Sequence, residues 1–173
     1  MENIPISPQG LELIKQELER LKKERPAIIQ AIKEAREEGD LSENAGYHAA
    51  RERQGMIEAK ISLLESKMAH FNVVNPDNIG KNGVAVYGAA VTVEDSDTGE
   101  RKEFILLGPD ETEHVAGGIS VLSPVGKALL GHGKGDEVTV RVPRGKIVYE
   151  IVSVEFRDLT SMFAAGNARV VSK

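Results

Sequence analysis

Two runs of apolar residues, spaced alternately three and four positions apart, constrain this chain more than any other feature. The first run consists of Leu11, Ile14, Leu18, Leu21, Ile28, Ile32 and Ala35, with the polar Arg25 filling one slot. The second run consists of Tyr47, Ala50, Gln54, Ile57, Ile61, Leu64, Met68 and Phe71. Such spacing is typical of helices that pack in a coiled coil. Because only a short segment separates the runs, we expect the two helices to form an antiparallel hairpin.

The first helix of this hairpin is expected to cover residues 7–38. At 1.5 Å per residue, that length corresponds to an arm of roughly 45–50 Å. Pro26 lies inside the pattern and lacks a backbone N–H, so we expect it to kink or split the helix. Gly39 is expected to end the helix, because glycine readily adopts the left-handed conformation found after helix ends.

The composition changes near residue 75, and glycine, proline and β-branched residues concentrate in the second half. Alternating patterns and turn residues predict strands at residues 84–86, 89–95, 103–107, 138–142 and 146–154. One short helix is predicted between them, with Ser123 as its N-cap, Pro124 as its first residue, residues 128–130 facing a core and Gly131 ending it.

The expected fold class is therefore α+β. A coiled-coil hairpin covers residues 1–75, with its tip near residues 37–44, and an antiparallel sheet with one packed helix covers residues 76–156. Residues 157–173 form a C-terminal extension to which the sequence assigns no role.

Composition excludes several classes of protein. The chain has no cysteine, which rules out disulfides, thiolate zinc sites and a catalytic thiol. No apolar run approaches the roughly 20 residues that cross a bilayer, and the N-terminus lacks a signal-peptide plan, so a soluble cytoplasmic protein is expected. The 22 basic and 27 acidic residues give a formal net charge of −5, which argues against a protein that coats nucleic acid alone.

Four carboxylates, at Glu37, Glu38, Asp40 and Glu43, lie close together at the predicted tip. Two interpretations remain open for them. In the first, Asp40 caps the second helix and Glu43 reaches back to complete a capping box, while the other two are solvated. In the second, Asp40 and Glu43 are oxygen ligands for one Mg²⁺, whose coordination a partner completes.

Basic residues flank the acidic tip, with Arg36 before it and Arg51 and Arg53 after it. They are either ordinary solvated residues, some of them paired with nearby carboxylates such as Glu38 or Glu52, or a small patch that steers a nucleic-acid strand past the tip. His48 has no neighbouring histidine or cysteine, and we interpret it as a surface residue rather than a metal ligand.

The stretch from Glu34 to Glu52 closely resembles the tip signature of the GreA and GreB family of bacterial transcript-cleavage factors. Its residues are more similar to those of the GreA branch than to those of the GreB branch. Two further matches occur at residues 119–131 and within residues 135–151, and the resemblance covers about residues 3–156. It implies an N-terminal coiled coil and a C-terminal domain of the FKBP-like fold.

The resemblance also implies a function. Members of the family dock at the secondary channel of RNA polymerase and, without being enzymes themselves, stimulate the Mg-dependent cleavage of the nascent RNA 3′ end in backtracked or arrested complexes. Asp40 and Glu43 match the tip residues that help hold a Mg²⁺ shared with the polymerase, which the isolated protein does not bind tightly.

Other positions match the family as well. Arg36 and Arg51 match its RNA-contacting basic patch, and Ser120, Ser123 and Pro124 lie in the segment implicated in polymerase docking.

A monomer with no membrane partner is expected, because the apolar seams are satisfied within the hairpin. The alternative is a secondary-channel regulator that modulates or inhibits polymerase without cleavage, although such relatives alter the tip carboxylates.

Two residues depart from the family's usual pattern. Gly46 costs up to about 1 kcal/mol if it lies in a helix interior, which would loosen the tip. Leu122 replaces a residue that is usually small and polar beside the docking segment.

Two other functions are disfavoured. A prolyl isomerase has an aromatic-lined pocket, and residues 76–156 offer few aromatics for one. A plain coiled-coil adaptor does not explain the acidic tip.

Overall fold

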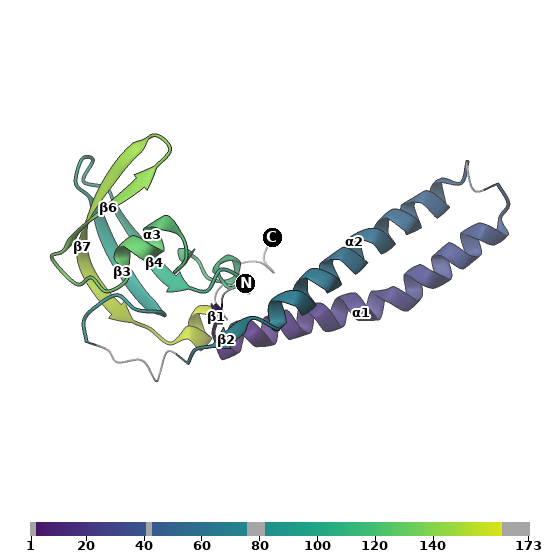
Figure 1. The fold of residues 1–173 in the computed structure, drawn as a ribbon, viewed down its shortest axis with the longest axis horizontal. Coiled ribbons are helices and arrows are strands. Elements are labelled where there is room, and N and C mark those ends of the chain that lie inside the picture. Colours follow the sequence, from purple (N-terminus) through teal and green to yellow (C-terminus); the bar gives the residue numbers. More distant parts are fainter. Residues whose placement is uncertain (1–2, 41–42, 76–81, 164–173) are drawn as a thin grey trace. The chain divides into compact units, whose positions relative to one another are not determined.

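A computed structural model describes residues 3–40, 43–75 and 82–163 (Figure 1). The chain divides into two compact units. One unit is a helical hairpin that covers Glu12–Phe71, and the other is a globular unit made of Asn3–Leu11 together with the chain from Asn72 onward. The N-terminal segment therefore groups with the globular unit, whereas the sequence placed it with the hairpin.

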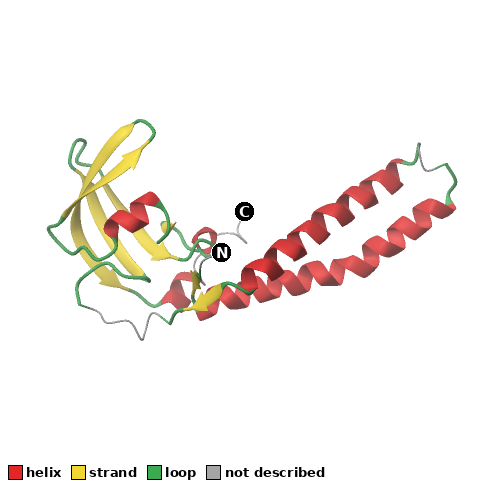
Figure 2. Ribbon diagram, in the orientation of Figure 1, coloured by secondary structure: helices red, strands yellow, loops and turns green. Residues whose placement is uncertain are grey.

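The hairpin consists of two long helices that run beside each other, α1 (Pro8–Glu37) and α2 (Ala45–Met68) (Figure 2). The predicted seam residues are buried or half-buried along both helices, and Leu21, Ile57 and Ile61 are almost fully enclosed. The predicted antiparallel hairpin is confirmed. Among the described residues, no helix combines the length and the apolar character that a membrane span needs.

Pro26 lies inside α1, which continues without interruption from Pro8 to Glu37. Of the two outcomes expected for Pro26, a kink or a split, the split is therefore wrong. Pro26 is exposed, so water can hydrogen-bond to the carbonyl that the proline leaves without a donor. The apolar seam then holds both sides of the helix against α2.

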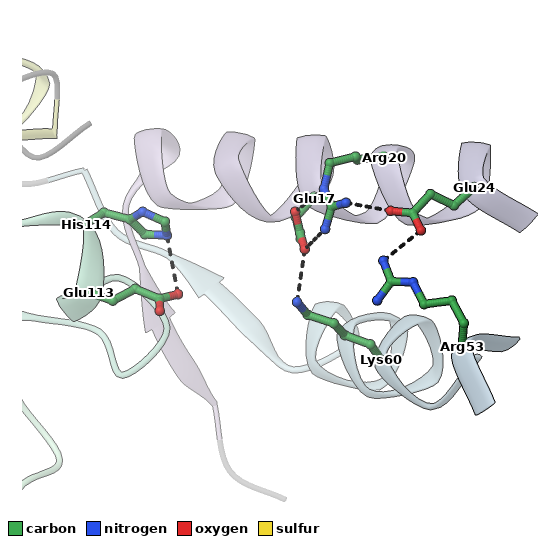
Figure 3. Close-up of polar contacts among 7 residues, drawn as sticks. All are labelled: Glu17, Arg20, Glu24, Arg53, Lys60, Glu113 and His114. Atoms are coloured by element: carbon green, nitrogen blue, oxygen red, sulfur yellow. Dashed lines mark hydrogen bonds and ion pairs between the residues drawn. The ribbon is translucent and has the colours of Figure 1, made fainter. Parts of the chain in front are cut away.

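Ion pairs connect the exposed edges of the two helices (Figure 3). Glu17 contacts Arg20 at 2.7 Å and Lys60 of α2 at 3.1 Å, and Glu24 contacts Arg20 and Arg53 of α2, each at 2.7 Å. Further pairs across the hairpin join Arg25 to Glu58 and Lys22 to Glu65. Individual exposed pairs stabilise little, but this connected set favours one register of the helices.

We predict that Glu17 makes the stability of the hairpin depend on pH in the acidic range. The hydrogen bonds from Arg20 hold the pKa of Glu17 at about 2, with Lys60 adding to the effect against the opposing effect of burial. Because this pKa lies below the ordinary value of 4.5, ionised Glu17 stabilises the fold fully above pH 4.5, and the contribution is lost as the pH falls toward 2.

Urea unfolding of the full chain, followed by circular dichroism at a series of pH values, checks this prediction. The stability difference between the wild type and Glu17→Gln should be largest at neutral pH and should shrink below pH 4.5. Glu12→Gln, an exposed change on the same helix, is the control and should show a much smaller difference. A Glu17→Gln difference that stays constant down to pH 2 contradicts the assignment.

Across the described part of the globular unit, five strands form one sheet in the order β5-β4-β3-β7-β6. The strands are β3 (Ala89–Asp95), β4 (Arg101–Leu107), β5 (Gly118–Ser120), β6 (Glu137–Val142) and β7 (Gly145–Phe156). Four of them confirm predicted strands, and β5 was not predicted. The sheet is mostly antiparallel as expected, but β4 and β5 pair in parallel.

Two short strands outside this sheet, β1 (Ile4–Ile6) and β2 (Phe71–Val73), pair with each other and were not predicted. The predicted strand at residues 84–86 is wrong, because Val84 forms only an isolated bridge with Gly133. Segments of three residues carry too little alternation to be recognised or excluded from sequence.

The core of the globular unit lies between the sheet and α3 (Pro124–Leu129). Its large, almost fully enclosed side chains include Val91, Val93, Leu106, Leu107, Leu129, Val140 and Ile151. Ser123 caps α3 and Pro124 begins it, as predicted. Leu130, however, is partly exposed and not a core residue, because the helix ends one residue earlier and Gly131 turns the chain with a φ of 82°.

A fully buried carboxylate, Glu111, joins three segments of the globular unit. It accepts hydrogen bonds from the Ser7 N–H at 2.6 Å, the Gly108 N–H at 2.8 Å, and the hydroxyls of Ser7 and Tyr87. Ser7 in turn caps α1, since its hydroxyl accepts from the Gly10 N–H. Burial and the charge of Glu111 raise the pKa of Tyr87, which keeps its hydroxyl a donor.

The first part of the C-terminal extension folds onto the globular unit. Residues 159–163 are helical, and Leu159 and Phe163 are buried. The Phe163 ring stacks on His114, which lies in the short 3₁₀ helix Thr112–His114. This part of the extension, to which the sequence assigned no role, is therefore a short helix packed on the globular unit. Residues 164–173 lie outside the described part.

Candidate functional site

The acidic tip lies between the two helices of the hairpin. α1 ends at Glu37, and Gly39 adopts the left-handed conformation with a φ of 117°, as predicted. Asp40 and Glu43 follow, and both are exposed and outside any helix. Leu41 and Ser42 lie between them and are outside the described residues.

The cap of α2 is Asn44, not Asp40. The Asn44 side-chain oxygen accepts from the Tyr47 N–H at 3.0 Å, and its amide group donates to the Ala35 carbonyl of α1 at 2.9 Å. One side chain therefore satisfies the start of α2 and the end of α1 together. The capping-box interpretation of Asp40 and Glu43 is wrong, and so is the expectation that α2 begins near residue 40.

The sequence contained a signal for this cap, because asparagine ranks with aspartate and serine among N-cap residues. It did not single out Asn44, since Asp40, Ser42 and Asn44 all lie in the turn. The bond to Ala35 decides between them, and it depends on the distance between the two helices.

Carboxylates such as Asp40 and Glu43 are the hard oxygen donors that Mg²⁺ prefers. In the described ranges, no group of three or more histidine, cysteine or acidic residues is arranged to hold a metal ion. Asp40 and Glu43 would supply only two ligands to a Mg²⁺, so such a site would need further oxygen ligands from elsewhere.

Near the tip, both helices line a groove of about 340 Å³. Its lining residues are Ile29, Ile32, Lys33, Arg36 and Glu37 of α1 and Arg51 and Gln54 of α2. The fold thus brings the two predicted patch residues, Arg36 and Arg51, to one concave surface, although they lie on different helices.

The basic residues behind the tip differ in their partners. Arg53 forms an ion pair with Glu24, so it belongs to the network that joins the helices. Arg51 donates to the side-chain oxygen of Gln54 at 3.2 Å. Within the described chain, neither Arg36 nor Arg51 forms an ion pair. The ion-pair interpretation therefore applies to Arg53 but not to Arg36 or Arg51.

The residues that follow the cap lie in the first turn of α2. Gly46 is the second residue of the helix, so the cost of glycine in a helix interior does not apply in full. His48 is exposed, as predicted, and its ring lies edge-on to that of Tyr47.

The predicted docking residues lie at the joint between β5 and α3. The Ser123 hydroxyl donates to the Ser120 carbonyl at 2.6 Å and accepts from the N–H of Gly126, and the Ser120 hydroxyl accepts from the Leu122 N–H at 3.0 Å. Both serines thus shape the segment. Pro124 is exposed, and so is 48% of Leu122, so these two apolar side chains lie at the surface of the segment.

Comparison with known proteins gives matches over most of the chain. Residues 4–73 match the family model "Transcription elongation factor, N-terminal", and residues 80–156 match "Transcription elongation factor, GreA/GreB, C-term". The chain is 63% identical to transcription elongation factor GreA of Nitratidesulfovibrio vulgaris over 90% of its length and 97% of the relative's. It is 62% identical to GreA of Solidesulfovibrio magneticus, over 90% and 94% of the two chains.

Among solved structures, the chain is similar to GreA factor homolog 1 (Gfh1) of Thermus thermophilus. The two share 29% identity with a TM-score of 0.43, and the match covers 89% of this chain and 99% of the other. Residues after 156 lie outside both family models.

Proposed function

Because the chain belongs to the GreA/GreB family of transcription elongation factors, and to its GreA branch, we propose that it stimulates transcript cleavage by RNA polymerase. The RNA concerned is the nascent 3′ end in backtracked or arrested complexes, reached through the secondary channel. The cleavage leaves a new 3′ end from which elongation resumes. In this role the chain is an accessory factor, and the polymerase performs the hydrolysis.

The observation that carries this proposal is the exposure of Asp40 and Glu43 at a tip whose helix cap is Asn44. Neither carboxylate is needed to begin α2, so both are suited to bind a ligand outside the chain. Together they would hold a Mg²⁺ that the polymerase also ligates, and the isolated chain would bind it only weakly. Such an ion, when bound, supplies positive charge at the scissile phosphate and activates water.

Other features support the same role. α1 has 30 residues and is therefore about 45 Å long, and two packed helices form a narrow rod that suits a pore. Pro124 and Leu122 offer an exposed apolar surface for docking. The seam is buried within the hairpin, which favours a monomer, and a partner that transcribes DNA implies a cytoplasmic protein.

The proposal is tested on a stalled, backtracked elongation complex whose RNA is labelled at the 3′ end. Adding the chain with Mg²⁺ should release short labelled fragments at a rate well above that of the polymerase alone. In a parallel complex whose RNA is labelled at the 5′ end, added nucleotides should then extend the shortened RNA. If the chain binds the complex but releases no fragments and slows elongation, it is the alternative regulator and the cleavage proposal is wrong.

A further inference from the structure

The globular unit is made of two segments that the hairpin separates along the chain, Asn3–Leu11 and the chain from Asn72 onward. The covalent path between them runs through the hairpin, so side-chain and strand contacts must hold the two segments together within the unit. The buried Glu111 makes one such contact, because it lies in the second segment and accepts from the Ser7 N–H of the first. Chain ends are poorly ordered unless they are tied down, so any further contact of the first segment is informative.

Residues 157–163, which we call the C-terminal strap, contact both segments. The Thr160 hydroxyl accepts from the side-chain amide of Gln9 at 2.8 Å, although the two positions are 151 residues apart. The Phe163 ring stacks on that of His114, with the centroids 6.3 Å apart and the planes inclined by 29°. Gln9 belongs to the first segment and His114 to the second. The strap therefore bridges the same two segments that the buried carboxylate joins.

The strap has a defined local structure. Its helix begins at Asp158, whose carboxylate accepts from the Thr160 N–H at 3.1 Å and from the Ser161 hydroxyl at 3.0 Å. Just before it, Arg157 donates to both carboxylate oxygens of Glu103 on β4, at 2.6 and 2.7 Å. Bidentate pairs of this kind fix direction as well as distance. The start of the strap is thus fixed on the sheet.

Apolar burial gives the strap its main contribution to packing. Leu159 and Phe163 lie four positions apart and hence on one face of the helix, and each is only 4% exposed. The side-chain oxygen of Gln9 is also buried, and it has no hydrogen-bond partner among the described residues. The contact between Gln9 and Thr160 is therefore part of an enclosed interface, in which apolar burial favours the closed state.

The strap lies beyond both family models, which end at residues 73 and 156, so the family resemblance gives it no role. We propose that it is an added fastener, which holds the N-terminal segment Asn3–Leu11 and the first turn of α1 on the globular unit. Without the strap, this segment would open locally far more often than the sheet does. The proposal is independent of the cleavage function, because the strap acts within the globular unit.

Native-state hydrogen exchange of the full chain, read by mass spectrometry, tests this role. Leu159→Ser with Phe163→Ser should speed amide exchange in residues 3–11 at least about tenfold, since losing buried large apolar side chains is costly. Exchange in β6 should change much less, because β6 is an edge strand that β3 and β7 separate from β4. Thr160→Val, which removes only the bond to Gln9, should give a smaller increase in the same residues.

Two controls separate a fastener from an ordinary part of the core. Ser161→Ala changes an exposed residue of the strap and should leave exchange in residues 3–11 unchanged. Val138→Ala removes a buried side chain of β6 and should speed exchange in β6 at least as much as in residues 3–11. If the strap variants give the same ratio of effects as Val138→Ala, or leave residues 3–11 unchanged, the proposal is wrong.

A rescue experiment uses the fact that the chain has no cysteine. Gln9→Cys and Thr160→Cys, added to the variant with serine at positions 159 and 163, supply two thiols that a short bismaleimide can join. The covalent bridge should return slow exchange to residues 3–11, because it replaces the lost contacts of the strap. A bridged chain that exchanges there as fast as the same variant treated with a monofunctional maleimide overturns the fastening role.

Discussion

Replacing Asp40 by asparagine together with Glu43 by glutamine is expected to abolish stimulated RNA cleavage while leaving binding to the polymerase nearly intact. The amides keep the shape of the carboxylates but remove the negative charge that a shared Mg²⁺ requires. A loss of at least about 100-fold in cleavage rate is expected. Mutation of residues that only hydrogen-bond to metal ligands already lowers metal affinity or activity about 10–100-fold, and loss of the ligands themselves should cost at least as much. Fragment release from labelled RNA and co-migration with the elongation complex measure the two effects separately.

Two control variants make this experiment specific. The pair Glu38→Gln with Glu52→Gln removes the same amount of charge from exposed positions near the tip, and cleavage should persist. Asn44→Ala removes the cap of α2 at a cost of about 0.5–2 kcal/mol, so it loosens the tip but keeps both carboxylates. Its cleavage rate should fall far less than that of the double variant.

The outcomes distinguish a ligand role from a structural one. If the double variant cleaves as well as the wild type, Asp40 and Glu43 do not hold the metal. If it loses cleavage but also loses as much thermal stability as Asn44→Ala, the carboxylates act on the fold of the tip. The expected result is lost cleavage with an unchanged melting temperature, since Asn44 performs the capping in this structure.

Replacing Glu111 by alanine is expected to destabilise the globular unit more than any surface substitution. The change leaves two N–H groups and the hydroxyls of Ser7 and Tyr87 buried without their acceptor. Breaking a buried charged network by removing one partner costs about 3–5 kcal/mol, a large part of the stability of an ordinary domain. Urea unfolding of the full chain, followed by circular dichroism, measures this loss.

Variants of neighbouring residues sharpen the test. Glu111→Gln keeps one acceptor oxygen and nearly the same volume, so it should destabilise the fold less than alanine does. Glu113→Ala removes an exposed carboxylate two residues away that contacts only His114, at 3.6 Å, among the described residues (Figure 3), and it should change stability little. If Glu111→Ala and Glu113→Ala unfold at similar urea concentrations, the buried carboxylate does not hold the unit together.

The buried carboxylate also illustrates what could not be predicted. Nothing in the sequence distinguishes Glu111 from the other acidic residues, because its neighbours Asp110 and Glu113 are also acidic. It is buried because Ser7, 104 positions earlier, is brought to it by the fold. The serine, in turn, was expected only as the beginning of a helix.

The candidate site likewise combines features that the sequence shows with features that only the structure shows. Its position at the end of a helical hairpin, its acidic composition and the nearby arginines are all visible in the sequence. The different surroundings of Arg51 and Arg53 are not visible in the sequence, since the two residues lie only two positions apart on one helix. Arg53 lies where Glu24 of α1 can reach it, whereas Arg51 lines the groove.

Features that repeat along the chain were thus predictable from the sequence alone. Seam spacing indicated two helices, alternation indicated four strands of the main sheet, and Ser123 and Pro124 indicated α3, because each signal lies within the element it describes. The cap of α2, the buried role of Glu111 and the unpaired cations of the groove depend on partners from distant segments. Such pairings follow from distances between packed elements, which no local pattern contains.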